Sequence, residues 1–208
     1  MDKMERYFDD MYGKTKGRRF SEEPRPNVRL IPSAQKRRKG LIALEIGAGE
    51  GQNLIYLSKH GYVCTATDIS SQALIRARKY AAEKGIKLAT AKLDIRRESI
   101  SGRYDCIIMA LVLHNLQTEE RYGAIKKIMK ATRKNGINFI SFYTERNGKK
   151  EMNLEPKLSF LGKDLEGSIT KIYRQKGWKI IELRRYNSIM KNKEPCKITT
   201  VIARKIGS

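Results

Sequence analysis

The sequence predicts an α/β fold built on a mostly parallel sheet, and three observations lead to that prediction. From Gly40 onward, short apolar runs alternate with stretches of helical periodicity, as in successive βαβ units. A glycine-rich turn joins the first apolar run directly to the first helical stretch. The chain has 208 residues, of which 40% are apolar, which suits one domain with a buried core. We therefore expect a single domain, with a core at residues 40–208 and an N-terminal extension at residues 1–39.

Seven apolar runs are the predicted strands, and the last two have no helix between them. Strands joined in this way are expected to pair antiparallel. The predicted strands are residues 41–46, 63–67, 88–92, 104–109, 137–142, 178–183 and 198–203.

Helical spacing and end signals predict the helices. One helix begins after Ser70, a good N-cap, and stops at Gly85. Another spans residues 118–136, with acids in its first turn and bases at its end, as the helix dipole prefers. Its expected buried stripe is Tyr122, Ile125, Ile128 and Met129. A long polar loop is predicted after residue 143, followed by a short helix over residues 164–176.

The cysteine and histidine content argues against disulfides and metal sites. Cys64, Cys106 and Cys196 are widely spaced and lie in apolar stretches, so we expect buried thiols, and only two histidines are present. No metal is predicted. Because there is neither a secretory signal nor an apolar run near the roughly 20 residues of a membrane span, we expect a soluble cytoplasmic protein with no membrane partner.

The formal net charge of +22 is unevenly distributed along the chain. It is +6 over residues 1–40, +1 over residues 41–120 and +15 over residues 121–208. A basic surface outside the glycine-loop half would attract an anionic substrate or partner, including nucleic acid. Lysines dispersed over solvated helix faces are the alternative interpretation, and the scattered charges favour neither.

The first predicted strand runs directly into the loop GAGEGQN, and a helical stretch follows. This order forms a cradle for a nucleotide-type ligand, because glycine lets the backbone turn sharply and lie close to it. The spacing is ExGxGxG, and Gln52 stands where dinucleotide enzymes have their third glycine. A carboxylate at Glu45 suits a cofactor with an amino group and no pyrophosphate, which indicates S-adenosylmethionine.

Two more acidic residues follow the next two strands. Asp68 ends the second strand, 23 positions after Glu45, where its carboxylate can accept hydrogen bonds from both ribose hydroxyls. Asp94 follows the third strand, where it can accept a hydrogen bond from the adenine amino group while Leu93 packs on the ring. A surface aspartate at a strand end is the alternative for Asp94.

Three stretches carry a resemblance to a known family: ALEIGAGEGQNLIYLSKHGYVCTATDIS, YDCIIMALVLHNL and TRKNGINFISF. Over residues 12–205 the chain resembles class I S-adenosylmethionine-dependent methyltransferases of the tellurite-resistance (TehB-type) group. The resemblance implies a Rossmann-like, seven-stranded, mostly parallel sheet with an antiparallel last strand and helices on both faces. It also implies S-adenosylmethionine as cofactor and S-adenosylhomocysteine as product. The expected cofactor contacts are Glu45, Gly47, Ala48, Gly49, Gly51, Asn53, Asp68, Ile69, Leu93, Asp94, Met109 and Ala110.

Methyl transfer from a sulfonium is an in-line displacement, so the protein must align the acceptor with the methyl group in a site that excludes water. The resemblance implies a small, soft nucleophile, which needs no base. Where such proteins often carry a His-Arg pair before the last strand, this sequence reads NSIMKNKEP. Metalloid chemistry therefore does not follow from the resemblance.

Candidate acceptor-site residues lie after the fourth strand and in the N-terminal extension. His114 can act as a base or orient an anionic acceptor, and Asn115 is placed beside it. The alternative is that His114 only caps or packs a helix start. Tyr12 and Arg18 are expected to face the substrate, and Arg25 to pair with the cofactor carboxylate or an oxyanion. Three prolines in SEEPRPNVRLIP predict an extended or turning path, with this extension as a lid.

Two other functions remain open from the sequence. An RNA methyltransferase would use the basic C-terminal half for phosphate contacts, although no base-holding Asn-Pro-Pro segment or RNA-binding module is present. A non-catalytic S-adenosylmethionine-binding protein would keep the same loop and acids. We expect a small-molecule substrate and a monomer or homodimer.

Overall fold

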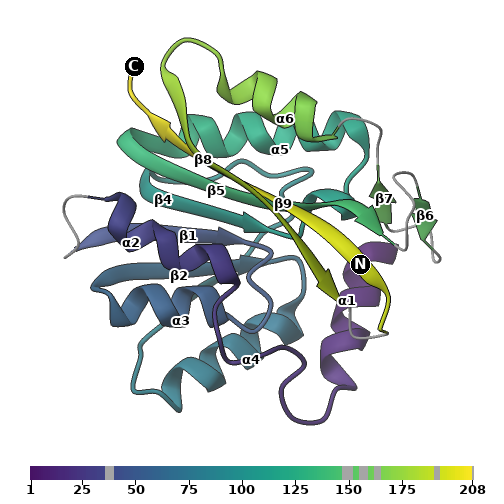
Figure 1. Cartoon of the computed structure of the whole chain (residues 1–208). Helices are drawn as coiled ribbons and strands as arrows, with labels where there is room; N and C mark the ends of the chain where they lie inside the picture. The colour runs from purple at the N-terminus through teal and green to yellow at the C-terminus, as the bar shows by residue number, and fades with distance from the viewer. Residues whose placement is uncertain (36–39, 147–151, 155–158, 162–164, 190–192, 208) are drawn as a thin grey trace. The chain divides into compact units, whose positions relative to one another are not determined.

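The computed structural model describes residues 1–35, 40–146, 152–154, 159–161, 165–189 and 193–207 (Figure 1). The chain divides into two compact units. The first comprises Met1–Ser99 with Tyr104–Ile108, and the second comprises Ile100–Arg103 with Met109–Ser208.

The helices and strands alternate along most of the chain, as the βαβ pattern predicts. The helices are α1 (Lys3–Gly13), α2 (Leu30–Ala34), α3 (Gln52–Lys59), α4 (Ser71–Ala82), α5 (Thr118–Ala131) and α6 (Leu165–Tyr173), with short 3-10 turns η1 (Pro26–Arg29) and η2 (Leu113–Asn115). The strands are β1 (Leu41–Ile46), β2 (Tyr62–Asp68), β3 (Ala89–Lys92), β4 (Tyr104–Ala110), β5 (Thr132–Arg146), β6 (Met152–Leu154), β7 (Ser159–Leu161), β8 (Trp178–Ile189) and β9 (Pro195–Lys205).

Seven of these strands form one sheet in the order β3-β2-β1-β4-β5-β9-β8. Strand β2 pairs parallel with both β1 and β3, whereas β9 pairs antiparallel with both β5 and β8. The prediction of a mostly parallel, seven-stranded sheet with an antiparallel last strand is therefore confirmed. Strands β6 and β7 form a separate two-stranded sheet.

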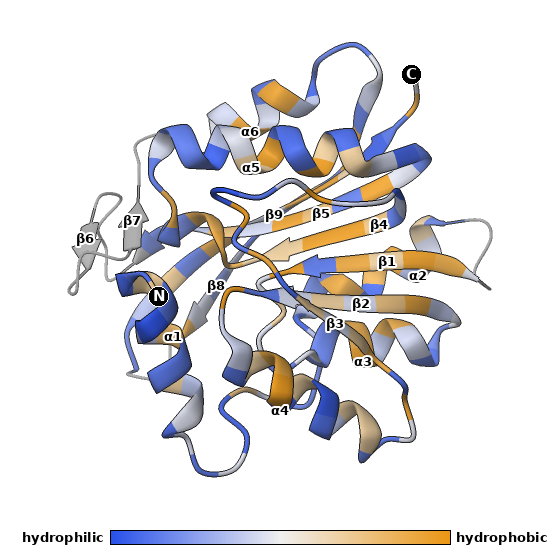
Figure 2. Cartoon of the chain, turned by 180° about the vertical axis from the view of Figure 1, so that it is seen from behind, coloured by the Kyte–Doolittle hydropathy of each residue, from blue (hydrophilic) through white to orange (hydrophobic). Residues whose placement is uncertain are grey.

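In the first unit, a buried strand and two amphipathic helices set up the glycine loop. Strand β1 is buried along almost its whole length and is coloured largely as hydrophobic in Figure 2. Helix α3 begins after Gly51, and α4 begins after Ser70, whose hydroxyl accepts a hydrogen bond from the amide of Ala73. Helix α4 buries the small residues Ala73 and Ala77. The predicted Ser70 cap is thus observed.

In the second unit, the hydrophobic core lies along β5 and β9. Phe139 and Phe142 of β5 are fully buried, and α5 contributes the equally buried Ile125. A hydrogen-bonded chain crosses this core: the Thr132 hydroxyl donates to the Asn138 side-chain oxygen (2.6 Å), and the Asn138 amide donates to the hydroxyl of Tyr173 (2.8 Å). Buried polar groups are paired in this way because burying one without a hydrogen-bond partner costs free energy.

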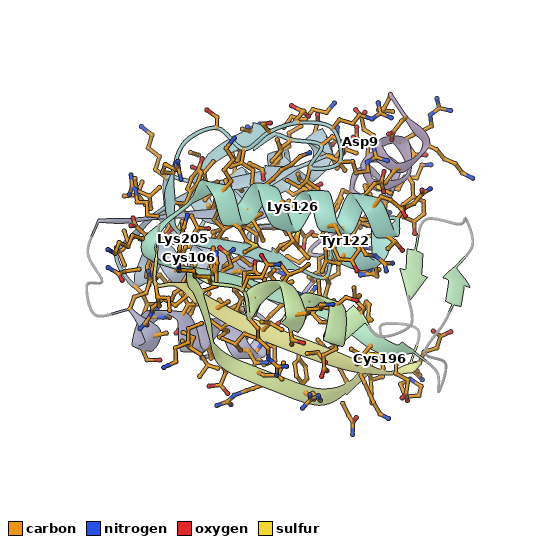
Figure 3. All side chains as sticks on the ribbon, turned by 90° about the horizontal axis from the view of Figure 1, so that it is seen from above. Asp9, Cys106, Tyr122, Lys126, Cys196 and Lys205 are labelled. Carbon is orange, nitrogen blue, oxygen red and sulfur yellow. The ribbon has the colours of Figure 1, made fainter. Side chains whose placement is uncertain are left out.

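The helix predicted over residues 118–136 is shorter than expected. Helix α5 ends at Ala131, and Thr132 adopts extended backbone angles and begins β5. Arg133 and Lys134 therefore belong to a strand rather than to a helix end. On α5 itself, Tyr122 is 38% exposed, so its predicted place in the buried stripe is wrong (Figure 3).

The N-terminal extension and the predicted polar loop also hold more regular structure than expected. The extension contains two helices, α1 and α2. Helix α1 is capped by Asp2, whose side chain accepts a hydrogen bond from the Glu5 amide. Strand β5 continues to Arg146, and β6 and β7 lie in what was predicted as a loop. Within the described parts of the chain, no helix combines the length and apolar character needed to cross a membrane.

Candidate functional site

The loop after β1 has the backbone conformation that its glycines predict. Gly47, Gly49 and Gly51 have φ values of 66°, 55° and 77°, in the left-handed region that disfavours a side chain. The Ala48 amide donates to the carbonyl of Thr67 on β2 (2.9 Å), which ties the loop to the neighbouring strand. Backbone amides are thereby held in a tight turn at the carboxyl end of β1, where α/β proteins bind ligands.

Asp68, at the end of β2, is hydrogen bonded to this loop. One carboxylate oxygen accepts from the Gly49 amide and the other from the Ser70 amide, each at 2.9 Å. The residue is only 6% exposed. Burial raises the pKa of Asp68 to about 6, and the hydrogen bonds from backbone amides limit that rise. A carboxylate has lone pairs for further donors, so this one can accept additional hydroxyl groups.

Glu45, near the end of β1, is a buried carboxylate with one satisfied oxygen. Its Oε1 accepts from the side-chain amide of Asn53 at 2.6 Å, whereas its Oε2 is buried without a hydrogen-bond partner among the described residues. Burial raises the pKa of Glu45 to about 8, opposed by Asn53 and by the positive charge of Arg25. An unpaired buried oxygen of this kind is costly unless a ligand supplies a donor.

Tyr12, at the end of α1, lies against the glycine loop. A Cβ added to Gly49 would lie 2.7 Å from the Tyr12 hydroxyl oxygen, so this close approach requires glycine. The tyrosine is 6% exposed. Burial raises its pKa well above the ordinary value, and the charges of Asp68 and Glu50 add to that effect. The N-terminal segment thus reaches the loop, as the lid hypothesis requires.

The N-terminal segment is also linked to each of the three acids singled out in the sequence. The Arg25 amide donates to Asn53, whose side chain holds Glu45. Asp9 accepts from the hydroxyl of Ser70 (2.6 Å), and the amide of Ser70 donates to Asp68.

The third link reaches Asp94 through an arginine. Arg96 makes ion pairs with both Asp2 and Asp94, and Arg97 also approaches Asp94, at 3.7 Å. The side chain of Asp94 is 15% exposed. These ion pairs give Asp94 a structural role, and its contact with an adenine stays a prediction.

Comparison with known proteins supports the interpretation of the loop. Residues 43–136 match the profile of a family described as "Methyltransferase domain". A relative from Haemophilus influenzae, named as a probable S-adenosyl-L-methionine-dependent methyltransferase TehB, is 30% identical over 97 residues, which are 47% of this chain and 34% of that protein. A 2-heptyl-1-hydroxyquinolin-4(1H)-one methyltransferase from Mycobacteroides abscessus is 31% identical over 99 residues, or 47% of this chain and 43% of that protein. The matches span less than half the length of these relatives.

Solved structures extend the likeness to nearly the whole chain. TehB from Haemophilus influenzae aligns over 97% of this chain and 66% of its own, with a TM-score of 0.70 and 23% identity. The N-methyltransferase NodS from Bradyrhizobium japonicum aligns over 98% of this chain and 99% of its own, with a TM-score of 0.71 and 18% identity. Residues 43–136 thus match a methyltransferase domain in sequence, and the chain has the fold of class I methyltransferases. It resembles TehB in both sequence and structure.

The structure brings one set of the predicted residues together in the first unit. The first unit holds the loop from Gly47 to Gly51 with Glu45, Asn53 and Asp68, joined by the hydrogen bonds above. At Gly51 an added Cβ would lie 3.3 Å from side-chain atoms of Ala77 and Leu88, so close packing as well as the positive φ favours glycine here. The other predicted cofactor contacts in this unit, Ile69 and Leu93, follow β2 and β3, and the Leu93 amide donates to the Asp68 carbonyl (3.0 Å).

Four other predicted site residues lie in the second unit. Met109 and Ala110 end β4, and His114 and Asn115 lie in η2. The His114 ring packs edge-on against Tyr143 with centroids 4.8 Å apart. This contact agrees with a packing role, and a catalytic role for His114 stays a prediction.

A buried arginine fixes the turn that carries His114 and Asn115. Arg121 of α5 is 4% exposed, and its Nε donates to the carbonyls of Leu113 and Leu116, both at 2.9 Å. The sequence did not single out this residue. The signal that could have indicated this role is an arginine in the first turn of a helix that follows a polar turn.

The two arginines predicted near the site differ in their surroundings. Arg18 stacks over the ring of Tyr80, with 4.1 Å from its guanidinium carbon to the ring centroid, and is largely buried. This packing supports a structural role for Arg18. Arg25 is half-buried and close enough to Glu45 to lower its pKa.

No metal centre emerges from the residues that the structure places. Within those residues, no group of three or more histidine, cysteine, aspartate or glutamate side chains could hold an ion. All three cysteines are free and buried, as their apolar surroundings predicted.

Proposed function

We propose that the chain is an S-adenosylmethionine-dependent methyltransferase acting on a small-molecule acceptor. The observation that carries the proposal is the unpaired Oε2 of Glu45, buried beside a glycine loop whose other flank is the Asp68 carboxylate. This pair suits a ligand with an ammonium group at one end and vicinal hydroxyls near the other. S-adenosylmethionine has both, and when bound it supplies a methyl group made electrophilic by the adjacent sulfonium.

Each predicted site residue around the glycine loop has a defined role in this proposal. Glu45 receives the ammonium group on its free oxygen, held in place by Asn53. Asp68 accepts the ribose hydroxyls on the lone pairs that the amides of Gly49 and Ser70 leave open. The left-handed glycines let the backbone approach the ligand without a Cβ in the way.

The N-terminal segment excludes water from this site. Tyr12 covers Gly49 with a nearly buried ring, and the Arg25 side chain lies near enough to Glu45 to complement the carboxylate of the ligand. Exclusion of water strengthens the electrostatic contacts and favours the displacement over side reactions. The division into a lid at residues 1–39 and a methyltransferase domain at residues 40–208 is part of this proposal.

The acceptor is proposed to be a small molecule with a soft or anionic nucleophile. The Mycobacteroides abscessus relative is named for a hydroxyquinolone substrate, which supports this class. We propose His114 and Asn115 as the residues that orient or deprotonate the acceptor, on a turn that Arg121 holds rigid. A thiolate or similar soft acceptor needs no base, so His114 would then only orient it.

An RNA acceptor is the second candidate, favoured by the charge of +15 over residues 121–208.

The three free, buried cysteines agree with a reducing compartment, and we propose the cytoplasm. A monomer or homodimer remains our expectation for the assembly.

Transfer of label distinguishes these functions. The protein is incubated with methyl-labelled S-adenosylmethionine and, in separate reactions, with a small-molecule extract or with total RNA. We expect label in the small-molecule fraction. Label only in RNA would support the second candidate, and cofactor binding without any transfer would support a non-catalytic binding protein.

A further inference from the structure

Arg76, in the middle of α4, binds the backbone at the end of α1 and just after it. Its guanidinium donates to the carbonyls of Tyr12 (3.3 Å) and Thr15 (3.0 Å), and also to that of Gly17. Its Nε donates to Glu50 at 2.9 Å, and the side chain is 16% exposed. Arginine can bind several carbonyls at once because its planar fork presents donors in fixed directions.

Glu50 holds the same segment from the other side. It lies inside the glycine loop and is 0% exposed. Its oxygens accept from the Arg19 amide (2.9 Å and 3.0 Å) and from the Phe20 amide (3.0 Å), in addition to Arg76. The carboxylate is thus fully engaged with the N-terminal segment rather than with a ligand. A buried charge of this kind is stable only when paired and hydrogen bonded.

These contacts place two aromatic rings over the loop. At the start of the held segment, the Tyr12 hydroxyl lies 2.7 Å from the position of a Cβ on Gly49, and at its end a ring carbon of Phe20 lies 4.0 Å from the same position. The two rings also meet edge to face, with centroids 6.4 Å apart. Residues 12–20 therefore form a strap that crosses the glycine loop and is fastened by a residue of that loop.

We propose that Glu50 and Arg76 form a latch that fastens this strap over the glycine loop and sets how fast the cofactor enters and leaves. The inference rests on the proposed function, because it takes the loop as the cofactor site. The latch is separate from the attachments of the earlier part of the N-terminal segment, which run through Asp2 and Asp9. Glu50 and Arg76 are positioning residues, since they act through Tyr12 and Phe20.

The first test reads the strap without any cofactor. Lys14, Lys16, Arg18 and Arg19 are trypsin sites within residues 12–20. We expect Arg76→Gln to speed cleavage there by about tenfold, because loss of charge-assisted hydrogen bonds opens the strap more often. Arg78→Gln is the matched control, an exposed arginine on the same helix whose side chain binds Thr90, and it should behave as the unchanged protein.

The second test measures exchange of S-adenosylhomocysteine by stopped-flow fluorescence. In Arg76→Gln and in Glu50→Gln, we expect the association and dissociation rates both to rise by about tenfold, while Kd changes by less than about threefold. A strap that gates entry and exit must change both rates. A merely structural loss at the site would raise the dissociation rate alone and weaken binding.

The outcomes separate the latch from the proposed function. Circular dichroism first establishes that each variant is folded. If Arg76→Gln does not fold, Glu50→Gln takes its place in both tests. Unchanged cleavage in a folded variant overturns the latch. Faster cleavage with unchanged exchange rates, or with only a faster dissociation, overturns its control of exchange. If the unchanged protein does not bind S-adenosylhomocysteine, the proposed function and the exchange role both fail, and the cleavage rates still report whether the strap is latched.

Discussion

The two units of the chain differ in the ionisable groups that bear on function. In the first unit, Glu45, Glu50 and Asp68 are buried acids beside one loop, each held by hydrogen bonds to named partners. In the second unit, Arg185 and Lys197 are exposed cations that pair with partly exposed acids on neighbouring elements.

The difference matters because burial of a charge is expensive and its exposure is not. A buried, incompletely paired carboxylate such as Glu45 therefore indicates a ligand, whereas an exposed lysine indicates little by itself. The net charge of +22 is the most conspicuous property of the composition, yet the first unit, with the smaller share of it, gives the stronger functional argument.

The largest expected effect is the loss of the Asp68 carboxylate. Asp68→Ala should weaken binding of S-adenosylhomocysteine by about 1–3 kcal/mol, because charge-assisted hydrogen bonds to the ribose are lost. Isothermal titration calorimetry measures the change. Glu83→Ala, which removes an exposed acid at the end of α4, is the control and should leave affinity unchanged. Equal affinities in the two variants would remove Asp68 from the site.

The buried acid Glu45 should make the same affinity depend on pH. With its pKa raised to about 8, Glu45 is mostly protonated at neutral pH and must ionise to receive an ammonium group. Affinity should therefore rise with pH, by about five- to eightfold between about pH 6.5 and 7.5, below the α-amino pKa of about 7.7–8.0. Glu45→Gln should bind more weakly and flatten this slope. A slope that persists in the variant would assign it to another group.

A smaller effect is expected on stability at the glycine loop. Gly49→Ala should lower the free energy of unfolding by about 1–2 kcal/mol from backbone strain alone, since φ is 55° at this position. It should cost more than Gly40→Ala, because Gly40 has a similar φ of 71° but open space around it, whereas the Tyr12 hydroxyl blocks Gly49. Urea denaturation compares the two variants. An equal loss of unfolding free energy in the two variants would mean that the Tyr12 hydroxyl does not pack closely against Gly49.

The smallest effect is expected on the exposed face of α5. Tyr122 and Lys126 lie one turn apart on this face, and both are exposed (Figure 3). Replacing either by alanine should change the free energy of unfolding by no more than about 0.5 kcal/mol. S-adenosylhomocysteine affinity should stay the same. A loss of RNA binding with a lower salt slope in Lys126→Ala would instead give the basic surface a function.

The parts of the fold that were predictable depend on local signals. Strand β1 begins and ends where its apolar run does, and the Ser70 cap and the left-handed glycines follow from short-range backbone chemistry. Glu45 and Asp68 were identified because each stands at a fixed place relative to a strand end. Their roles toward a cofactor remain predictions, since no ligand contact tests them.

The parts that were missed depend on long-range contacts. Glu50 holds amides 30 and 31 residues away in the chain, and no pattern around it shows that partner. The end of α5 was misplaced because Arg133 and Lys134 look like a helix end, whereas the backbone is already extended at Thr132 and leads into the part of β5 that pairs with β9 from Ile137 onward. Tertiary pairing outweighs local preference at such boundaries.

A crystal soaked with S-adenosylhomocysteine tests the central claim most directly. We predict density for the ligand along the glycine loop, with its ribose hydroxyls on Asp68 and its ammonium group on the free oxygen of Glu45. An intact fold with no ligand at the loop, at a concentration that saturates other class I methyltransferases, would contradict it.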